Sequence, residues 1–348
     1  TAILESETRT YTRLDYIQDP AGRRMTYGYD EQQGYLTSAR DVLLNITNYA
    51  YTPTTHKLET ITYPEGGHKY FTYYTDDYGR LESEYRDNNE EKRTYIYSTT
   101  EPKLTIKDYY NKETIIYFNE FGMTTSITDA YLKTTYYTWD TDLNRTGIKD
   151  PENNETTFTY DGMGNMLTIT RKKDGVFYTT TYTYNSTYNK LETITDAKSR
   201  LATEFGYDPT NGNLRTITNK IPGGTDYVTI FAYDSHGQLE TKTDAKNHIT
   251  RYTYNNNGLL HEEKREKDPS TIYTTTYVYD ANGNFLTVTD AENHTTTYTY
   301  NALNQLLELK DANNHSTYYT YDRNSNLKTI RDAKNHLTTY NYDLLDRL

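Results

Sequence analysis

Residues 289–300 read Thr-Asp-Ala-Glu-Asn-His-Thr-Thr-Thr-Tyr-Thr-Tyr, and the spelling returns at residues 310–321 as Lys-Asp-Ala-Asn-Asn-His-Ser-Thr-Tyr-Tyr-Thr-Tyr. It returns once more at residues 331–342, so a period of 21 residues governs the last third of the chain. A unit this short cannot bury enough apolar surface to fold alone, so it needs its neighbours for stability. The sequence therefore predicts a repeat array.

Each unit contains a Thr- and Tyr-rich run that ends at an aromatic residue, most often a Tyr that is followed by Asp or Asn. We call this aromatic the marker residue. Over residues 151–348 the markers are regular: Tyr160-Asp161, Tyr184-Asn185, Tyr207-Asp208, Tyr233-Asp234, Tyr254-Asn255, Tyr279-Asp280, Tyr300-Asn301, Tyr321-Asp322 and Tyr342-Asp343. Over residues 1–150 they are degenerate: Tyr29-Asp30, Tyr51-Thr52, Tyr74-Thr75, Tyr97-Ser98, Phe118-Asn119 and Trp139-Asp140. We expect about fifteen units of 21–26 residues in one continuous array over residues 1–348, as a fragment of a longer protein.

Alternation within a unit predicts two strands joined by turns. In residues 294–300, Thr296, Tyr298 and Tyr300 project to one face and the intervening threonines to the other. Residues 285–289 form the second expected strand, after the turn-forming residues 280–284. No helical period is sustained, so we predict an all-β fold, a strip of antiparallel hairpins that must curl or close to protect its edges.

The second turn of each unit contains Asp, Ala, a variable residue and Asn. These turn residues are Asp244, Asn247, Asp290, Asn293, Asp311, Asn314, Asp332 and Asn335. Asn can adopt the left-handed backbone conformation that otherwise requires Gly, and Asp can accept hydrogen bonds from its own turn. Where units are longer, as at residues 220–225 and 267–270, we expect the extra residues to lengthen loops.

The composition excludes several classes of protein. The net charge is -12 and no stripe of Lys or Arg tracks a phosphate backbone, so we expect no nucleic-acid partner. There is no Cys, which excludes disulfides and thiolate metal sites, and no apolar run long enough to insert into a membrane. The hydrophobic fraction of 34% would favour disorder, but 41 tyrosines provide rings that pack while their hydroxyls stay hydrogen-bonded.

The stretches Tyr-Asp-Gly-Met-Gly-Asn-Met-Leu at residues 160–167 and Tyr-Asp-Ala-Asn-Gly-Asn-Phe-Leu at residues 279–286 resemble the YD repeat, also called the RHS repeat. In that family the repeats form a β-strip that spirals into a hollow shell. The shell encloses the C-terminal toxic part of bacterial polymorphic and insecticidal toxins, and related repeats form the extracellular barrel of teneurins. The chain departs from the family where Asn247, Asn293, Asn314 and Asn335 replace a common Gly.

Three motifs could suggest a functional site. His248, His294, His315 and His336 recur at one repeat position, but equivalent positions in successive hairpins lie about 9–10 Å apart, too far to share a metal. The Asp turns could suggest calcium, yet one carboxylate per turn is a poor ligand set. Toxin shells of the resembled family can cut themselves near a C-terminal Asp-Pro pair, whereas Asp19-Pro20 lies near the start in an ordinary turn. We therefore predict no catalytic, cofactor or metal residue.

The leading hypothesis is a non-enzymatic structural segment of a secreted or cell-surface bacterial protein, which encloses or presents a C-terminal toxin or effector of its own polypeptide. One alternative is an adhesion module that binds carbohydrate or protein through Tyr faces, although we expect those faces to serve intersheet packing and cross-strand pairing. The other is a filament subunit that assembles with copies of itself through free sheet edges or ends.

Overall fold

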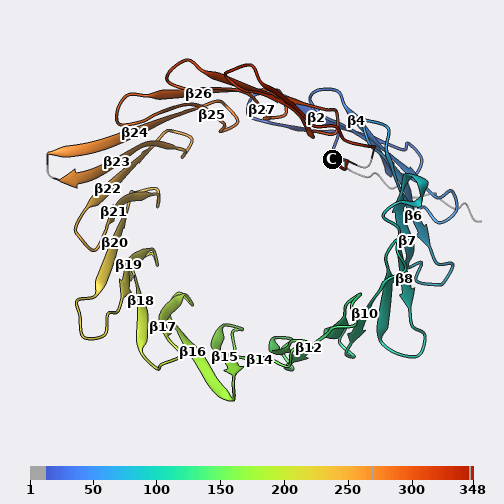
Figure 1. Ribbon diagram of the computed structural model, residues 1–348, viewed down its shortest axis with the longest axis horizontal. Helices are drawn as coiled ribbons and strands as arrows, with labels where there is room; N and C mark the ends of the chain where they lie inside the picture. Colours follow the sequence, from blue (N-terminus) through green and yellow to red (C-terminus); the bar gives the residue numbers. More distant parts are fainter. Residues whose placement is uncertain (1–12, 269, 345) are drawn as a thin grey trace, which may run out of the picture. The chain divides into compact units, whose positions relative to one another are not determined.

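The structure is a computed structural model that describes residues 13–268, 270–344 and 346–348. The first 12 residues of the expected array lie outside this part of the chain. The described residues form thirty strands of a single sheet, and their only helical element is the three-residue turn η1 (Asp87–Asn89). The predicted all-β hairpin fold is thereby confirmed, and Figure 1 shows the strands following one another in chain order.

The chain divides into two compact units. Unit 1 comprises the described parts of Thr1–Arg93, which we call the first segment, and of Tyr277–Leu348, which we call the second segment. Its strands are β1 (Tyr16–Gln18), β2 (Arg24–Tyr29), β3 (Leu36–Arg40), β4 (Ile46–Tyr51), β5 (Leu58–Thr62), β6 (His68–Tyr73), β7 (Leu81–Arg86), β25 (Phe285–Thr289), β26 (Thr295–Tyr300), β27 (Leu306–Lys310), β28 (Ser316–Tyr321), β29 (Leu327–Arg331) and β30 (Leu337–Thr339).

Unit 2 comprises Thr94–Thr276, and strands β8 and β24 extend a few residues across its limits. Its strands are β8 (Arg93–Tyr97), β9 (Lys103–Lys107), β10 (Glu113–Phe118), β11 (Thr124–Thr128), β12 (Thr134–Trp139), β13 (Arg145–Lys149), β14 (Glu155–Tyr160), β15 (Met166–Lys173), β16 (Val176–Tyr184), β17 (Leu191–Thr195), β18 (Leu201–Tyr207), β19 (Leu214–Asn219), β20 (Tyr227–Tyr233), β21 (Leu239–Thr243), β22 (Ile249–Tyr254), β23 (Leu260–Asp268) and β24 (Thr271–Tyr279).

Pairing is antiparallel and local, since strands adjacent in sequence are adjacent in the sheet. Thr297 of β26, for example, lies opposite Thr287 of β25 on one side and opposite Lys310 of β27 on the other. Threonine hydroxyls connect many such pairs, including Thr159 with Thr168 at 2.7 Å. These cross-strand pairs stabilise a sheet whose threonines could not do so by apolar burial.

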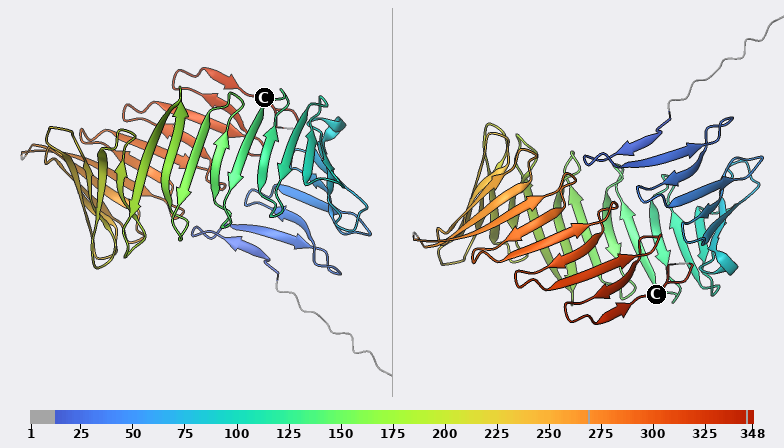
Figure 2. Two further views of the ribbon diagram at one scale, coloured as in Figure 1. Left: turned by 90° about the horizontal axis from the view of Figure 1, so that it is seen from below. Right: turned by 90° about the horizontal axis from the view of Figure 1, so that it is seen from above.

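Each of the two compact units is a single layer of strands, and Figure 2 shows no second sheet over either face within unit 1 or within unit 2. Among the described residues, the only buried apolar side chain is Phe158, with 9% of its surface exposed. The sequence-based expectation that the Tyr faces serve intersheet packing was therefore wrong, although cross-strand pairing does occur. Cohesion depends instead on half-buried rings, hydroxyl pairs and backbone ladders spread along the whole strip.

A β-bulge recurs where a marker residue ends its strand. Thr159 lies opposite Thr168 and the marker Tyr160 lies opposite Met166, so one residue of β15 is left without a counterpart. The same register shift occurs at Tyr29, Tyr51, Trp139, Tyr184, Tyr207, Tyr233, Tyr254, Tyr300 and Tyr321. A bulge bends a strand and increases its local twist, so the bend is built into the repeat.

Two sequence-based expectations about individual units were wrong. The marker in the third unit is Tyr73, one residue before the expected Tyr74, because the bulge falls between Thr72 and Tyr73. In addition, most of the extra residues around 267–270 lengthen strands: β23 and β24 have nine residues each, and Pro269 lies outside the described residues. Added residues can continue a hairpin ladder, which pairs their backbone groups, whereas a longer loop would leave those groups unpaired.

Candidate functional site: the turns and the seam of the repeat array

In many units the marker side chain connects the unit to the one before it. The hydroxyl of Tyr254, at the end of β22, donates a hydrogen bond of 2.9 Å to the carbonyl oxygen of Leu239, the first residue of the preceding strand β21. The indole N–H of Trp139 does the same to Thr124 at 2.7 Å, which explains why Trp can replace Tyr. Equivalent hydroxyl bonds are made by Tyr29, Tyr51, Tyr73, Tyr160, Tyr184, Tyr207 and Tyr321.

Burial raises the pKa of several marker phenols above the ordinary value, as at Tyr184, Tyr207, Tyr254, Tyr279, Tyr300 and Tyr321. The remaining markers of the regular part, Tyr160, Tyr233 and Tyr342, are half-buried. Burial thus favours the neutral phenol at the six residues with a raised pKa. Four of them, Tyr184, Tyr207, Tyr254 and Tyr321, also donate the hydroxyl bonds described above.

The residue after the marker organises a turn at one edge of the strip. Oδ1 of Asp161 accepts the backbone N–H groups of Met163 and Asn165, both at 2.9 Å, and Asn165 also donates its side-chain amide to Oδ2. That side-chain bond is the main reason that the pKa of Asp161 is lowered. The carboxylates of Asp208, Asp234, Asp280, Asp322 and Asp343 accept backbone N–H groups in the same way. We call these turns the marker edge.

The alternate turns lie at the opposite edge, which we call the spacer edge. In the turn of residues 290–294, Asp290 accepts the backbone N–H groups of Glu292 and His294, and Asn293 has a φ of 63°. Asn247, Asn314 and Asn335 have φ values of 67°, 63° and 65°, in the left-handed region that Asn tolerates. Bonds from the backbone N–H groups of the following histidines lower the pKa of Asp244, Asp290, Asp311 and Asp332.

The four repeated histidines pair with their own turns. Nδ1 of His248, His294, His315 and His336 lies 2.9–3.2 Å from Oδ2 of the Asp four residues earlier. Between 49% and 74% of each His side chain is exposed. Across the described ranges, no group of three or more His, Asp or Glu residues is placed to hold a metal ion.

Within unit 1, the spacer edge of the first segment meets the marker edge of the second segment. The contact begins at the turn of residues 19–23, where the N–H of Ala21 donates to Oδ1 of Asn282 at 3.3 Å. Arg23, held by Asp19 at 2.7 Å, extends to the carbonyl of Asn301 and to Oδ1 of Asn304 at 2.7 Å. Asp19-Pro20 thus lies in an ordinary turn of this contact, which we call the seam.

The seam continues two turns further along. The N–H of Glu65 donates to Oδ1 of Asn324 at 3.1 Å, and the N–H of Arg323 donates to Oε1 of Glu65 at 2.9 Å. Gly67 is buried there, and a Cβ on it would overlap the backbone oxygen of Leu344. No larger residue fits at this position without moving the backbone.

The seam ends in ion pairs. Arg86 lies 3.9 Å from Asp346, and Arg347 pairs with Glu90. Residues about 260 positions apart in sequence are therefore joined turn to turn, with no strand ladder between them. Figure 2 shows the two segments of unit 1 as neighbouring rows of strands.

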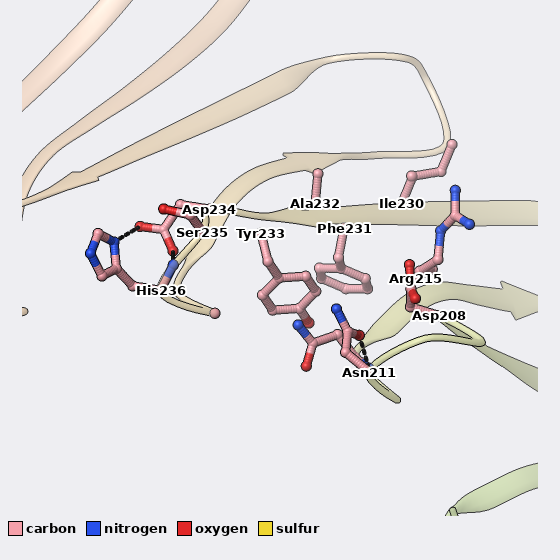
Figure 3. Close-up of a pocket in the computed structure, with 12 residues that line it drawn as sticks. Asp208, Asn211, Arg215, Ile230, Phe231, Ala232, Tyr233, Asp234, Ser235 and His236 are labelled. Carbon is pink, nitrogen blue, oxygen red and sulfur yellow. Dashed lines mark hydrogen bonds and ion pairs between the residues drawn. The ribbon is translucent and has the colours of Figure 1, made fainter. Parts of the chain in front are cut away.

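Unit 2 has an open pocket of about 690 Å³ between the turn after Tyr207 and the turn after Tyr233. Figure 3 shows the rings of Phe231 and Tyr233 on the side of β20 that faces Asn211, with Ile230 and Ala232 on the other side. Asp208 and Arg215 line the same pocket. It combines aromatic rings with carboxylate, amide and guanidinium groups.

Comparison of the sequence with known families gives three matches to the family described as RHS Repeat, at residues 139–176, 233–271 and 279–316. Each matched segment begins at a marker residue: Trp139, Tyr233 and Tyr279. These three segments are RHS repeats. The resemblance inferred from the Tyr-Asp spelling is thereby confirmed. No curated protein matches the chain.

Solved structures share the fold of this chain. The structure titled TcdB2-TccC3-TEV superimposes with a TM-score of 0.68 at 14% identity, over 94% of this chain and 19% of that one. TcdB2-TccC3 without its hypervariable C-terminal region gives 0.53 at 16% identity, over 92% and 22%. A Tc holotoxin pore of Photorhabdus luminescens gives 0.51 at 17%, also over 92% and 22%. The chain therefore spans about a fifth of the length of these structures.

The seam was missed by sequence reasoning, although the marker and spacer turns that form it were recognised. Ala21 and Gly67 are ordinary turn residues by their spelling, and nothing local to them indicates a partner near residue 282 or 344. Only one of the two edges of each segment takes part in the seam. The contact therefore adds no periodic residue pattern to the sequence of either segment.

The described part of the chain contains no helix with the length and apolarity that a membrane crossing requires.

Proposed function

We propose that this RHS-repeat segment is a non-enzymatic wall, part of a secreted or cell-surface bacterial protein that encloses or presents a C-terminal toxin or effector of its own polypeptide. The seam is the observation that carries the proposal. A strip of hairpins has two edges, and joining one edge of an early segment to the opposite edge of a later segment turns the strip into a continuous surface without consuming either face.

Two further features support a wall. The sheet is one layer thick, so its area per residue is large, and its bulges bend it at most of the markers. The TcdB2-TccC3 structures that share its fold come from toxin complexes, and one title names a hypervariable C-terminal region in that protein. A variable part attached to a constant wall is the arrangement we propose for this chain.

Limited proteolysis of the complete polypeptide tests enclosure. The C-terminal part should resist a protease that digests the same part when it is expressed alone, and it should become sensitive when the wall is denatured in mild urea. Digestion at equal rates in both settings would exclude enclosure. Digestion with the fragment still bound to the wall would show presentation instead.

A second candidate function, glycan binding, is favoured by the pocket beside Tyr233. Sugars stack on aromatic rings and hydrogen-bond to carboxylates and amides, and Phe231, Asp208 and Asn211 provide those groups. Titration with a panel of oligosaccharides should give saturable binding that Phe231→Ala abolishes. Binding that persists unchanged in Phe231→Ala, or no binding at all, would remove this candidate.

A further inference from the structure

Unit 1 has two edges that the seam does not use. The seam joins the spacer edge of the first segment to the marker edge of the second. Within this unit, the marker edge of the first segment and the spacer edge of the second therefore lie outermost. The outer spacer edge consists of the turns at residues 290–294, 311–315 and 332–336, each with an Asp–His pair.

These histidines occupy the turn position that Arg23 holds in the seam. The N–H of Asp19 donates to the carbonyl of Arg23, and Arg23 returns its own N–H and its guanidinium to the Asp19 carboxylate. Asp290 and His294 make the same three contacts, with Nδ1 in place of the guanidinium. Arg23 has donors left over, and it uses them on the carbonyl of Asn301 and on Asn304 across the seam.

An imidazole can do the same only when it is protonated. In the neutral ring with Nδ1–H directed at Asp, Nε2 is an acceptor, so it cannot bind a carbonyl or a carboxylate. Protonation, which for His falls between pH 5 and 8, converts Nε2 into a donor. The spacer edge of the second segment thus has the geometry of the seam and a donor that depends on pH.

We propose that this edge binds the marker edge of the first segment in a second copy of the chain, head to tail, and that protonation of His294, His315 and His336 strengthens the contact. The same two segments meet in the seam through their other edges. First-segment markers recur every 22 residues and second-segment spacer turns every 21, the same two periods that the seam already accommodates.

The first-segment marker edge carries the carboxylates Asp30, Glu31, Asp76 and Asp77 together with Lys57 and Arg80, and Arg80 pairs with Asp76. Glu31 and Asp77 are exposed. Opposite them would lie three imidazolium groups. The charged groups that face the imidazoles in the present structure are the turn carboxylates Asp290, Asp311 and Asp332, together with Glu292 at 3.6 Å from His294. Lys334 lies in the turn of His336.

Such a contact is heterologous, so it propagates. Each copy would present a free spacer edge at one end and a free marker edge at the other, which allows chains of copies and not only dimers. At pH 7 the net charge of -12 opposes this association, and protonation both reduces the repulsion and adds the donors. The proposal concerns association between chains and does not depend on the wall function.

Sedimentation of the 348-residue chain tests the proposal. The weight-average mass should at least double between pH 7.5 and pH 6.0, which is still above the pI of about 5.2. The triple variant His294→Gln, His315→Gln, His336→Gln should remain monomeric at pH 6.0. The triple variant with Arg at these positions should associate already at pH 7.5, because a guanidinium stays protonated at this pH and keeps the donors that Arg23 uses in the seam.

A matched control adds positive charge elsewhere. The control is the triple variant Ser186→Arg, His236→Arg, Asn257→Arg, whose three positions lie in exposed turns of unit 2. It should stay monomeric at pH 7.5. Glu31→Gln with Asp77→Asn should weaken association of the wild type at pH 6.0. A monomeric Arg variant, equal association of the control, full association of the Gln variant, or no effect of the acidic-edge substitutions would each overturn the proposal.

Discussion

The marker hydroxyls should contribute measurably and additively to stability. Tyr51, Tyr207, Tyr254 and Tyr321 each donate one hydroxyl bond, of 2.6–3.1 Å, to a backbone carbonyl of the preceding unit. Changing each to Phe keeps the ring and removes only that bond, so each should lower the free energy of unfolding by about 1 kcal/mol. The four sites lie in non-adjacent units, so the quadruple variant should lose about 4 kcal/mol.

Urea denaturation followed by far-UV circular dichroism measures this loss as a lower midpoint. With a slope of about 3 kcal/mol/M, the midpoint of the quadruple variant should fall by about 1 M. The control is the quadruple Phe variant of Tyr136, Tyr178, Tyr227 and Tyr273, which are exposed and whose hydroxyls make no bond within the described residues. Equal midpoints for the two variants would refute the role assigned to the hydroxyl bonds.

Three further predictions concern the turns. Gly67→Ala should displace Leu344 and speed amide exchange of Glu65, measured by hydrogen–deuterium exchange, whereas Gly162→Ala, where a Cβ meets nothing, should leave it unchanged. Asn314→Ala should cost about 1 kcal/mol in urea denaturation because of its left-handed backbone, and Asn314→Gly should cost almost nothing; equal losses would contradict this. Hydrogen bonds from the side chain and backbone of Arg200 lower the pKa of Asp196 from 3.8 to about 2, so Asp196→Asn should be less stable than the wild type at pH 6. Since the ionised form is the one stabilised, that difference should shrink as the pH falls below 4 and vanish near 2; a pH-independent difference would exclude the linkage.

Local residue patterns predicted the repeat well because each unit bonds mainly to its neighbours in sequence. Alternation in residues 294–300 defines a strand whose partners are the strands immediately before and after it. The Asp and Asn spellings of the turns specify hydrogen bonds that close within five residues. Neither inference requires knowledge of any distant part of the chain.

Register and strand length were predicted less well where the spelling is ambiguous. Tyr73 and Tyr74 are adjacent and chemically equal, so composition cannot decide which one ends the strand. The bulge decides, since it places Tyr73 opposite Leu81 and directs its hydroxyl to Leu58. Similarly, the residues added around 267–270 could form a loop or extend a ladder, and the pairing of β23 with β24 determines the outcome.

The sequence by itself determined the period, the alternating strands, the two kinds of turn and the RHS repeats of the three matched segments, because all of these depend on contacts between residues close in sequence. Only the tertiary structure decided that the turn at Ala21 meets Asn282 and that Gly67 lies against Leu344. Those contacts depend on the bend and twist summed over the strands between them. A small change in the bend or twist of each repeat would displace the partners by many ångströms. The residues near Ala21 or Asn282 do not by themselves specify that summed bend and twist.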